Sequence, residues 1–353
     1  MATTPSMTLA RQGFRMPAEW EPHAATWLSY PRRECHSFLT QFNGIPDVWL
    51  AICQHLVPHE EVHLNYFDED HRHELEGVLK RGGISGNPTI HLHPFPAYEP
   101  WCRDHGPIFV KRPHPPGLAV VDWDFNAWGL KYPSFDLDDE VPARSARHLH
   151  LPLIRPGLIL EGGSIDVNGC GSLLTTESCL LNRNRNPHLS KREIEQALCD
   201  HLGATNILWL GKGISGDDTD GHVDDLSRFV APDTIVTIVE EDPTDINHAV
   251  LQDNLRRLRS MKDQDGKPFR IVTLPMPGVF VREGRRLPAS YANFYIANNV
   301  VLMPAYQHPN DAKAQRILQE LFPKRKVIPV DCRQLIWGRG AIHCITQQQP
   351  SLP

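Results

Sequence analysis

Amphipathic stretches alternate with short apolar runs of β-forming residues along most of this chain. Apolar residues that recur every three or four positions predict a helix, and a short run of branched apolar residues predicts a buried strand. Five times a predicted helix is followed by a predicted strand: Asp47–Val57 by Val62–Phe67, Asp70–Arg81 by Thr89–His93, Lys191–Leu202 by Ile207–Leu210, Asp245–Met261 by Phe269–Leu274, and Asp311–Phe322 by Val327–Val330. This recurrence predicts an α/β fold.

Signals at and between these segments extend the prediction. Ser190 and Glu193 form a capping box at the start of the third predicted helix. Further apolar runs predict additional strands at Ile108–Lys111, Leu118–Trp123, Leu158–Leu160 and Ile235–Val239. Because no Ser- and Gly-rich linker divides the five units, we expect one pseudo-symmetric α/β array, a single domain over residues 16–353. Residues 1–15 are expected to be a disordered N-terminal extension.

Composition and charge narrow the class of protein. Of the 353 residues, 41% are hydrophobic and 22% are charged, which is typical of a globular protein with a sizeable core. A net charge of −6 without a basic stripe argues against nucleic acid and favours a cationic partner. No apolar run approaches the roughly 20 residues that cross a bilayer, and no secretory signal is evident. The eight cysteines form no C-x-x-C pair, which predicts reduced thiols in a cytoplasmic protein. A homo-oligomer is possible.

Four polar segments contain the groups that a thiol nucleophile needs. They are Trp101–Pro107, Glu161–Ser164, Gly216–Asp225 and Gly338–Gln348. Three of them, the first and the last two, follow a predicted strand, so we expect these loops to converge where a ligand binds.

Cys344 is the candidate nucleophile. It lies in a glycine-flanked turn, which allows a thiol to approach a substrate closely. A cysteine beside a histidine is more often a small buried apolar residue, so the other segments must support this role. His222, with Asp224 two residues later, is the candidate acid/base, because the unperturbed pKa of histidine suits proton transfer near neutrality. An EF-hand reading of the same segment fails, because it places Gly216 and Ser227 at the positions that require Asp and Glu.

The remaining candidates would bind a planar cation. Asp104 could accept two hydrogen bonds from a guanidinium group while Trp101 offers its ring face; alternatively, Arg103 and Asp104 simply pair with neighbours. Glu161 either lies in a plain hairpin turn or is presented to a ligand by the two glycines that follow it.

No metal site or cofactor is expected. His91 and His93 alternate on one predicted strand and share a face, which is compatible with a metal ion. No third ligand with suitable spacing follows, so both are assigned to packing or to the surface.

Together these motifs resemble those of the agmatine deiminase family, from about Met16 to the C-terminus. The matching segments are Met16–His23, Trp101–Pro107, Leu160–Ser164, Leu180–Pro187, Asp218–Asp224, Asn293–Asn298 and His343–Gln348. The resemblance implies a five-bladed α/β propeller that hydrolyses agmatine to N-carbamoylputrescine and ammonia, in polyamine (putrescine) biosynthesis.

The resemblance also implies roles for individual residues. Cys344 would be the nucleophile, His222 the acid/base, Glu161 its partner, and Asp104 and Asp224 the guanidinium ligands. Two neighbours in the second motif, Trp101 and Arg103, complete the candidate substrate-binding set.

One residue departs from the family pattern. Many family members have three glycines and an asparagine before Ile-His-Cys, whereas this chain has Arg339 between Gly338 and Gly340. A cation there could lower the thiol pKa, or it could repel the amine of agmatine and favour a substrate with a carboxylate. Deimination of free or peptidyl arginine therefore stays open as an alternative. Amidino transfer, a non-catalytic guanidino-binding protein and a metal-dependent hydrolase are further alternatives that do not depend on Arg339.

Overall fold

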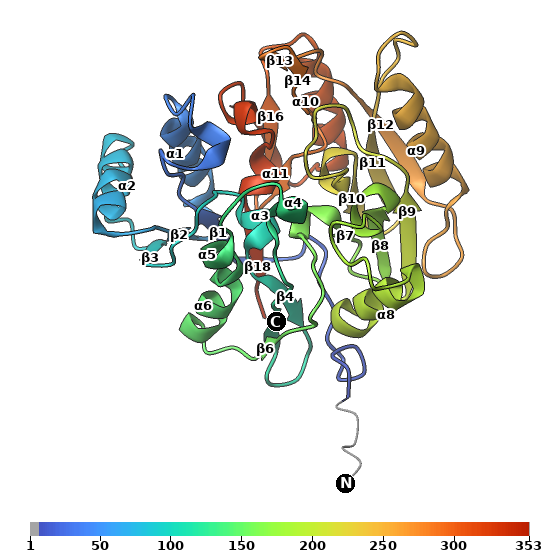
Figure 1. Ribbon diagram of the computed structural model, residues 1–353, viewed down its shortest axis with the longest axis horizontal. Coiled ribbons are helices and arrows are strands. Elements are labelled where there is room, and N and C mark those ends of the chain that lie inside the picture. The colour runs from blue at the N-terminus through green and yellow to red at the C-terminus, as the bar shows by residue number, and fades with distance from the viewer. Residues whose placement is uncertain (1–6, 353) are drawn as a thin grey trace.

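A computed structural model describes residues 7–352 of this α/β protein. Its helices are of two kinds, longer helices and one-turn helices. The longer helices are α1 (Ile45–Leu56), α2 (Glu69–Arg81), α6 (Val141–His148), α8 (Lys191–Leu202), α9 (His248–Ser260) and α10 (Asn310–Leu321). The one-turn helices are α3 (Cys102–His105), α4 (Ala127–Leu130), α5 (Asp136–Asp139), α7 (Glu177–Leu180) and α11 (Ile342–Ile345), with 3₁₀ turns η1 (His36–Phe38), η2 (Gly162–Ser164), η3 (Val223–Asp225) and η4 (Leu335–Gly338). Figure 1 shows α3, α4 and α11 near the middle of the molecule and the longer helices around them.

Within residues 7–352, five sheets share one strand pattern, an antiparallel pair followed by a parallel strand. Their orders are β18 (Gln347–Pro350), β1 (His23–Ser29), β2 (Glu61–Asn65), β3 (Ile90–His93); β4 (Ile108–Lys111), β5 (Leu118–Val121), β6 (Leu153–Ile154); β7 (Asp166–Val167), β8 (Ser172–Thr176), β9 (Asn206–Leu210); β10 (Ser227–Ala231), β11 (Thr234–Val239), β12 (Arg270–Pro275); and β15 (Tyr295–Ile296), β16 (Val300–Ala305), β17 (Lys326–Asp331). Strands β13 (Val281–Arg282) and β14 (Arg285–Arg286) form a separate hairpin.

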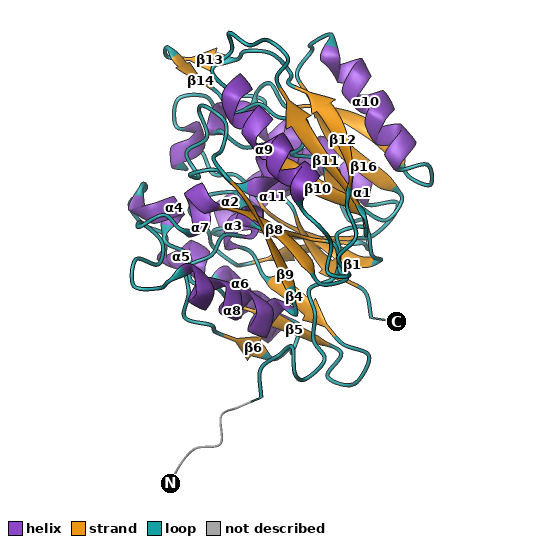
Figure 2. Ribbon diagram, turned by 90° about the vertical axis from the view of Figure 1, so that its right-hand side faces the viewer, coloured by secondary structure: helices purple, strands orange, loops and turns teal. Residues whose placement is uncertain are grey.

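The two ends of the chain meet in one sheet. Strand β18 pairs antiparallel with β1, with Gln347 opposite Trp27. Figure 2 shows the C-terminal end beside β1. The C-terminal segment that contains Cys344 is therefore anchored against the first strand of the chain.

The five predicted helix–strand units were partly wrong in their grouping. All five helices are present within a few residues of their predicted bounds, and the capping box of Ser190 and Glu193 forms at the start of α8. However, β2 and β3 belong to the same sheet, so the first two units are one. The sheet of β4, β5 and β6, with α6, was not counted because α6 spans 8 residues and β6 only 2.

The predicted strand Leu158–Leu160 was also wrong. Only Ile159 forms a bridge there, to Asp124. Leu158 and Leu160 are buried at 3% and 1% exposure, so the apolar run reflects a buried loop and not a strand.

The expected disorder of residues 1–15 does not hold for residues 7–15. Leu9 and Phe14 are buried. The backbone of Arg15 exchanges hydrogen bonds of 2.8 and 3.0 Å with that of Lys111. This segment packs on the domain because it supplies apolar side chains to the core cluster that includes Ile194 and Leu198; residues 1–6 lie outside the described residues.

The fold brings polar segments to equivalent places in all five sheets. Asp104 precedes β4, Glu161 precedes β7, His222 precedes β10, Asn293 precedes β15, and Cys344 precedes β18. Each candidate segment thus enters the first strand of a different sheet. No described helix is both long and apolar enough to span a bilayer.

Candidate active site

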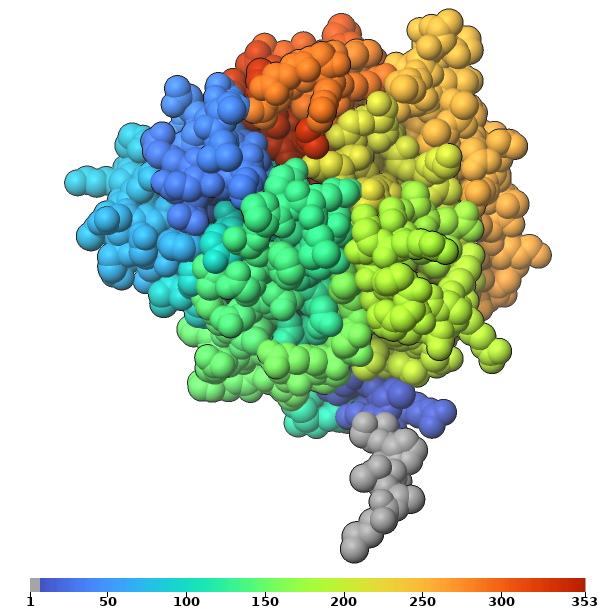
Figure 3. Space-filling model, viewed as in Figure 1, coloured from blue at the N-terminus to red at the C-terminus, as the bar shows by residue number. Residues whose placement is uncertain are grey.

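Segments that precede the first strands of three sheets, those that enter β4, β10 and β18, line one narrow cavity. Figure 3 shows the red C-terminal segment recessed between the blue and the yellow-green parts of the chain. The residues that line the cavity are Ser37, Trp101, Asp104, Trp128, Tyr132, Asp218, Thr219, Gly338, Arg339, Gly340 and Cys344. The structure therefore brings Cys344, Asp104 and Trp101 to one opening, and His222, Glu161 and Asp224 are fully buried behind it.

Asn293 positions the Cys344 thiol. Its Nδ2 lies 3.1 Å from Sγ of Cys344 and donates a hydrogen bond to it. Its Oδ1 accepts from the backbone N–H groups of His343 and Cys344, at 3.0 and 3.3 Å. One amide side chain thus holds both the sulfur and the backbone of the nucleophile. Asn293 was assigned no role from the sequence, although it lies in the matched segment Asn293–Asn298.

The glycines before Cys344 allow the turn to pack against Trp101. A Cβ atom on Gly340 would lie 2.3 Å from the Trp101 ring, and one on Gly338 would lie 2.6 Å from the ring of Phe38. Neither position can accept a side chain without displacement of an aromatic ring. Trp101 is itself held by a 2.8 Å hydrogen bond from Nε1 to the hydroxyl of Ser37.

Negative charge surrounds the thiol. Burial raises its pKa well above the ordinary value, and the carboxylates of Asp224, Asp225 and Asp104 raise it further. The Asp224 carboxylate lies 3.8 Å from Sγ. Without a bound cation the thiol is therefore protonated, and a cation placed among these carboxylates would lower its pKa.

Arg339 does not supply that cation. Its guanidinium group lies 2.8 Å from Asp218, which also accepts a hydrogen bond of 2.5 Å from Tyr132. The alternative in which Arg339 lowers the thiol pKa is thus not supported, since the pKa is raised. Arg339 adopts a φ of +70° at the mouth of the cavity, where its charge is already offset.

His222 lies between two carboxylates. Nδ1 is 3.5 Å from Asp104 and Nε2 is 3.8 Å from Glu161, which are ion-pair distances beyond a hydrogen bond. Within the described part of the chain, neither ring nitrogen has a hydrogen-bond partner. Burial acts to lower its pKa, but Asp104, Cys179 and Glu161 outweigh it, and the pKa is raised well above the usual value. His222 is therefore a cation with both N–H groups ready to donate.

Arg185 holds Glu161 in place. Its Nε donates a 2.6 Å hydrogen bond to Glu161, and both side chains are fully buried. Burial alone would raise the pKa of Glu161, yet Arg185 and His222 bring it below the usual value. Glu161 thus stays ionised beside His222. Arg185 was given no role from the sequence, although it belongs to the matched segment Leu180–Pro187.

The two candidate guanidinium ligands are fixed by different partners. Asp104 accepts hydrogen bonds from the backbone of Gly163 at 3.0 Å and from Nε1 of Trp128 at 2.8 Å, and burial raises its pKa to about 6. Asp224 accepts a 2.7 Å hydrogen bond from Nδ1 of His343, and its other oxygen has no partner within residues 7–352. Burial acts to raise the pKa of Asp224. His343, together with His222 and Arg228, outweighs burial, so the pKa is lowered from its usual value.

Gly163 forms the floor between these groups. A Cβ atom there would lie 2.6 Å from His222, 2.7 Å from Asp104 and 3.0 Å from Asp224. Only glycine allows the three side chains to converge.

Arg103 does not lie in the cavity. Its guanidinium group donates to the side chains of Gln347 and Gln348 at 2.7 Å each, and it lies 3.3 Å from Glu19. It is 2% exposed. The structure places Arg103 in a buried polar network and not among the groups that a substrate could contact.

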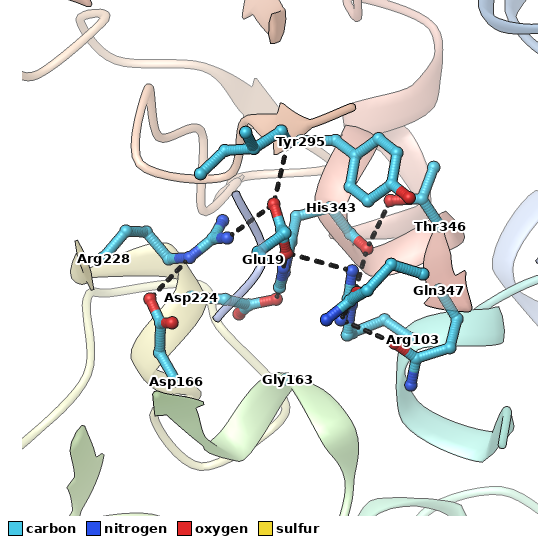
Figure 4. A network of polar contacts seen from close by, with 12 residues as sticks. Glu19, Arg103, Gly163, Asp166, Asp224, Arg228, Tyr295, His343, Thr346 and Gln347 are labelled. Atoms are coloured by element: carbon cyan, nitrogen blue, oxygen red, sulfur yellow. Dashed lines mark hydrogen bonds and ion pairs between the residues drawn. The ribbon is translucent and has the colours of Figure 1, made fainter. Parts of the chain in front are cut away.

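Figure 4 shows this network, which we call the Glu19 network: Glu19, Arg103, Arg228 and His343. Glu19 contacts Arg228 at 2.9 Å and His343 at 2.8 Å, and it accepts a 2.7 Å hydrogen bond from the backbone of Ile296. Burial acts to raise the pKa of Glu19, but Arg228, His343 and Arg103 lower it well below the usual value. Because His343 also donates to Asp224, the network supports the active site from behind.

Among residues 7–352, three groups of side chains have the spacing of metal ligands. Two share atoms with the site described above: Glu161 with Cys179 and His222, and Asp224 with Asp225 and Cys344. The third, Glu61 with His63 and His91, lies on strands β2 and β3 and shares no residue with that site.

Known proteins resemble this chain over nearly its whole length. Residues 15–350 match the family of Porphyromonas-type peptidyl-arginine deiminases. The agmatine deiminase of Stutzerimonas stutzeri is 37% identical, with 99% of both chains covered. The solved agmatine deiminase of Enterococcus faecalis has a TM-score of 0.90 at 33% identity, with 99% of both chains covered. A Cys-to-Ser variant of the C. jejuni agmatine deiminase with substrate bound has a TM-score of 0.86 at 31% identity, with 96% of this chain and 97% of that chain covered. The chain therefore belongs to the Porphyromonas-type peptidyl-arginine deiminase family, and the resemblance to agmatine deiminases that its motifs predicted is confirmed.

Proposed function

We propose that this protein hydrolyses agmatine to N-carbamoylputrescine and ammonia through a covalent intermediate on Cys344. The observation that carries the proposal is the convergence of a thiol, two carboxylates and a buried cationic histidine at one cavity. The choice of agmatine rests on the named activity of the relatives that align over the full chain.

Binding would begin with the guanidinium group between Asp104 and Asp224. The unpartnered oxygen of Asp224 is a ready acceptor for an N–H of the substrate. Planar guanidinium suits paired carboxylates because it donates several hydrogen bonds in a fixed geometry. The incoming charge offsets the carboxylates that raise the thiol pKa, so the Cys344 proton leaves to solvent as the substrate enters.

The thiolate then attacks the central guanidino carbon and forms a C–S bond. His222, which is protonated, donates a proton to the departing amino group, and ammonia leaves with cleavage of its C–N bond. The product is a thiouronium ester on Cys344 and a neutral His222. Water attacks this ester while His222 takes one of its protons, and cleavage of the C–S bond releases the thiolate and the urea, whose remaining hydroxyl proton goes to solvent. Glu161, held by Arg185, keeps the ring of His222 oriented and stabilises its charge.

The far end of the substrate would meet the Arg339–Asp218 pair at the cavity mouth. The ammonium group of agmatine would share Asp218 with Arg339. Free arginine would instead present a carboxylate to Arg339, and this is the alternative that a substrate comparison must exclude.

The test is a product assay of ammonia and ureido compound with agmatine, free arginine and arginyl peptides, with Cys344→Ala as the control. We expect turnover with agmatine and at least about 10⁴-fold less in Cys344→Ala, which should still bind agmatine. Ammonia release by that variant at the wild-type rate would exclude Cys344 as the nucleophile. Ammonia release only when an amine acceptor is added would indicate amidino transfer, and activity that a strong chelator abolishes would indicate a metal-dependent hydrolase.

Arg339→Gly tests the specificity directly, because the φ of +70° at this position suits glycine. If agmatine is the substrate, kcat/KM for agmatine should stay equal or rise. A loss of arginine turnover with little agmatine turnover in either protein would overturn the substrate assignment.

We further propose that the five sheets form a five-bladed pseudo-symmetric propeller in a single domain over residues 16–353. The repeated strand pattern and the equivalent position of each site segment support this arrangement. A role in polyamine (putrescine) biosynthesis, a cytoplasmic location and a homo-oligomeric state stay predictions, as does the lack of a nucleic-acid partner.

A further inference from the structure

A second group of ligand-type side chains lies on one face of β2 and β3. The two strands are parallel, with His63 directly opposite His91. Glu61 precedes His63 by two positions on β2, so all three side chains share one face of the sheet. In Figure 1 these strands lie at the left edge, away from α3 and α11 at the centre. The sequence pattern pointed only to the histidines of β3. It did not indicate Glu61 and His63, because they lie on a different strand.

The three side chains converge on one point. Oε2 of Glu61 lies 3.7 Å from Nε2 of His63 and 3.5 Å from Nε2 of His91. These ligand atoms all lie within 4.8 Å of one another. Ligands of a tetrahedral zinc ion at about 2.0–2.1 Å lie about 3.4 Å apart, so a small closure of the two rings would complete such a site.

The hydrogen bonding of the two histidines leaves ring nitrogens that face Glu61. Nδ1 of His63 lies 2.6 Å from Nε2 of His93, and a hydrogen bond donated by His63 there leaves its Nε2 as the lone-pair nitrogen facing Glu61. Nε2 of His91 is buried and has no hydrogen-bond partner in the described chain.

Packing accounts for part of this arrangement. The ring of His63 stacks on Trp27 with centroids 4.2 Å apart, and on His91 with centroids 4.8 Å apart. Stacking explains why the rings are parallel. It does not require a carboxylate at ion-pair distance from both Nε2 atoms, beside a nitrogen that lacks a partner.

We propose that Glu61, His63 and His91 bind a divalent transition-metal ion such as Zn²⁺ at a site separate from the cavity. Two imidazole nitrogens and one carboxylate are a donor set that zinc accepts, with a fourth position open to water. The side chains of Glu61 and His91 are 55% and 38% exposed, so an ion can enter from solvent. A bound ion would link β3, the edge strand of its sheet, to β2.

The test is calorimetric titration of the full chain with Zn²⁺, and with Co²⁺ as a spectroscopic probe. We expect wild type to bind one ion that Cys344→Ala retains, with Co²⁺ bands that lack a thiolate charge-transfer absorption. His91→Gln and Glu61→Gln should each weaken binding at least about tenfold. His73→Gln, an exposed histidine on α2, is the matched control and should bind as wild type does.

Folding failure does not obscure the result, because Glu61 and His91 lie at the surface and their variants can be compared by thermal unfolding without metal. Metal-free activity of both variants should equal that of wild type. The proposal is overturned if wild type binds no ion, if both variants bind within twofold of wild type, or if Cys344→Ala abolishes the site.

Discussion

Two buried polar clusters lie side by side in this protein and differ in their balance of charge. The thiol cluster consists of Asp104, His222, Asp225 and Cys344, and the Glu19 network supplies the second. Around the thiol, carboxylates outnumber cations, and the pKa of each of its four members is raised. Around Glu19, two arginines and His343 surround one carboxylate whose pKa is well below its usual value.

The thiol cluster therefore has negative charge that is not offset, whereas the carboxylate of Glu19 is offset by its partners. Both nitrogens of His222 lack hydrogen-bond partners in residues 7–352, whereas the carboxylate of Glu19 contacts Arg228, His343 and a backbone N–H. A guanidinium substrate would supply the cation that the thiol cluster lacks. Substitutions in the Glu19 network should therefore cost stability first, and substitutions in the thiol cluster should cost activity first.

The largest expected effect is on stability, from Glu19→Gln. Removal of this charge leaves Arg103 buried without its anion and leaves Arg228 with Asp166 as its remaining partner, which should lower the free energy of unfolding by about 3–5 kcal/mol in urea at pH 7. Because the pKa of Glu19 is lowered on folding, its contribution is present above the unfolded value of 4.5 and is lost as pH falls through the folded pKa. The gap between the two proteins should therefore narrow in acid.

Glu76→Gln is the control for this change, since it breaks an exposed pair with Arg72 and should cost less than about 1 kcal/mol. Equal stability of Glu19→Gln and wild type at pH 7 would show that the Glu19 network is not a stabilising unit.

Asp104→Asn should lower activity more than stability, which is the opposite of the effect expected for Glu19→Gln. Loss of one of the two proposed guanidinium ligands should lower kcat/KM by about 10²–10³-fold, because a buried carboxylate that would pair with the substrate is removed. Folding raises the pKa of Asp104 from 3.8 to about 6, so its contribution to stability is present below 3.8 and lost as pH rises through about 6. At pH 8 the variant should unfold within about 1 kcal/mol of wild type or be more stable. A marked loss of stability with nearly unchanged kcat/KM would reverse the distinction between the two clusters.

Asn293→Ala sharpens the comparison at the thiol itself. The change removes the amide that holds Sγ and the backbone of Cys344, and misplacement of the sulfur should lower kcat by about 10²-fold with a smaller change in KM. The pH dependence of Cys344 alkylation by iodoacetamide should also shift, which a purely structural role would not produce. Asn254→Ala is the matched control, because Asn254 is equally buried but bonds the backbone of Gly211 and Lys212. If Cys344 in Asn293→Ala is alkylated with the same pH dependence as in wild type, Asn293 does not position the thiol.

The smallest effect is the acid limb of the pH profile. If Asp104 binds the guanidinium group as proposed, it must be ionised to do so, and burial raises its pKa to about 6, so kcat/KM should fall about tenfold per pH unit below that value. His222, whose pKa is raised, stays protonated throughout this range. The limb should disappear in Asp104→Asn, and a limb that persists unchanged there would have to belong to another group.

Much of the fold could be predicted because its signals are local. The capping box of α8 and the apolar periodicity of α10 depend on residues a few positions apart. The sheet of β4, β5 and β6 was missed because its helix and last strand are short, and the loop Leu158–Leu160 was taken for a strand because burial by distant elements produces the same apolar run.

The candidate site divides in the same way. Cys344, His222 and Asp104 were recognisable because their residue types lie in dense polar motifs, and the fold does bring them together. Arg103 was misplaced because its motif gives no sign of which way the side chain points. Its partners at Glu19 and Gln347 lie 84 and 244 positions away, and only packing selects them.

The sequence by itself thus determined an α/β chain of the agmatine deiminase type with a cysteine and its acidic partners. The reason is that hydrophobic periodicity and motif composition are properties of short segments of the chain. Only the tertiary structure decided which carboxylates are offset and which are left for a substrate, that Arg339 is paired with Asp218, and that Glu61 joins His63 and His91. Charge balance in a buried cluster depends on groups from several sheets, and their distances exist only once the chain is folded.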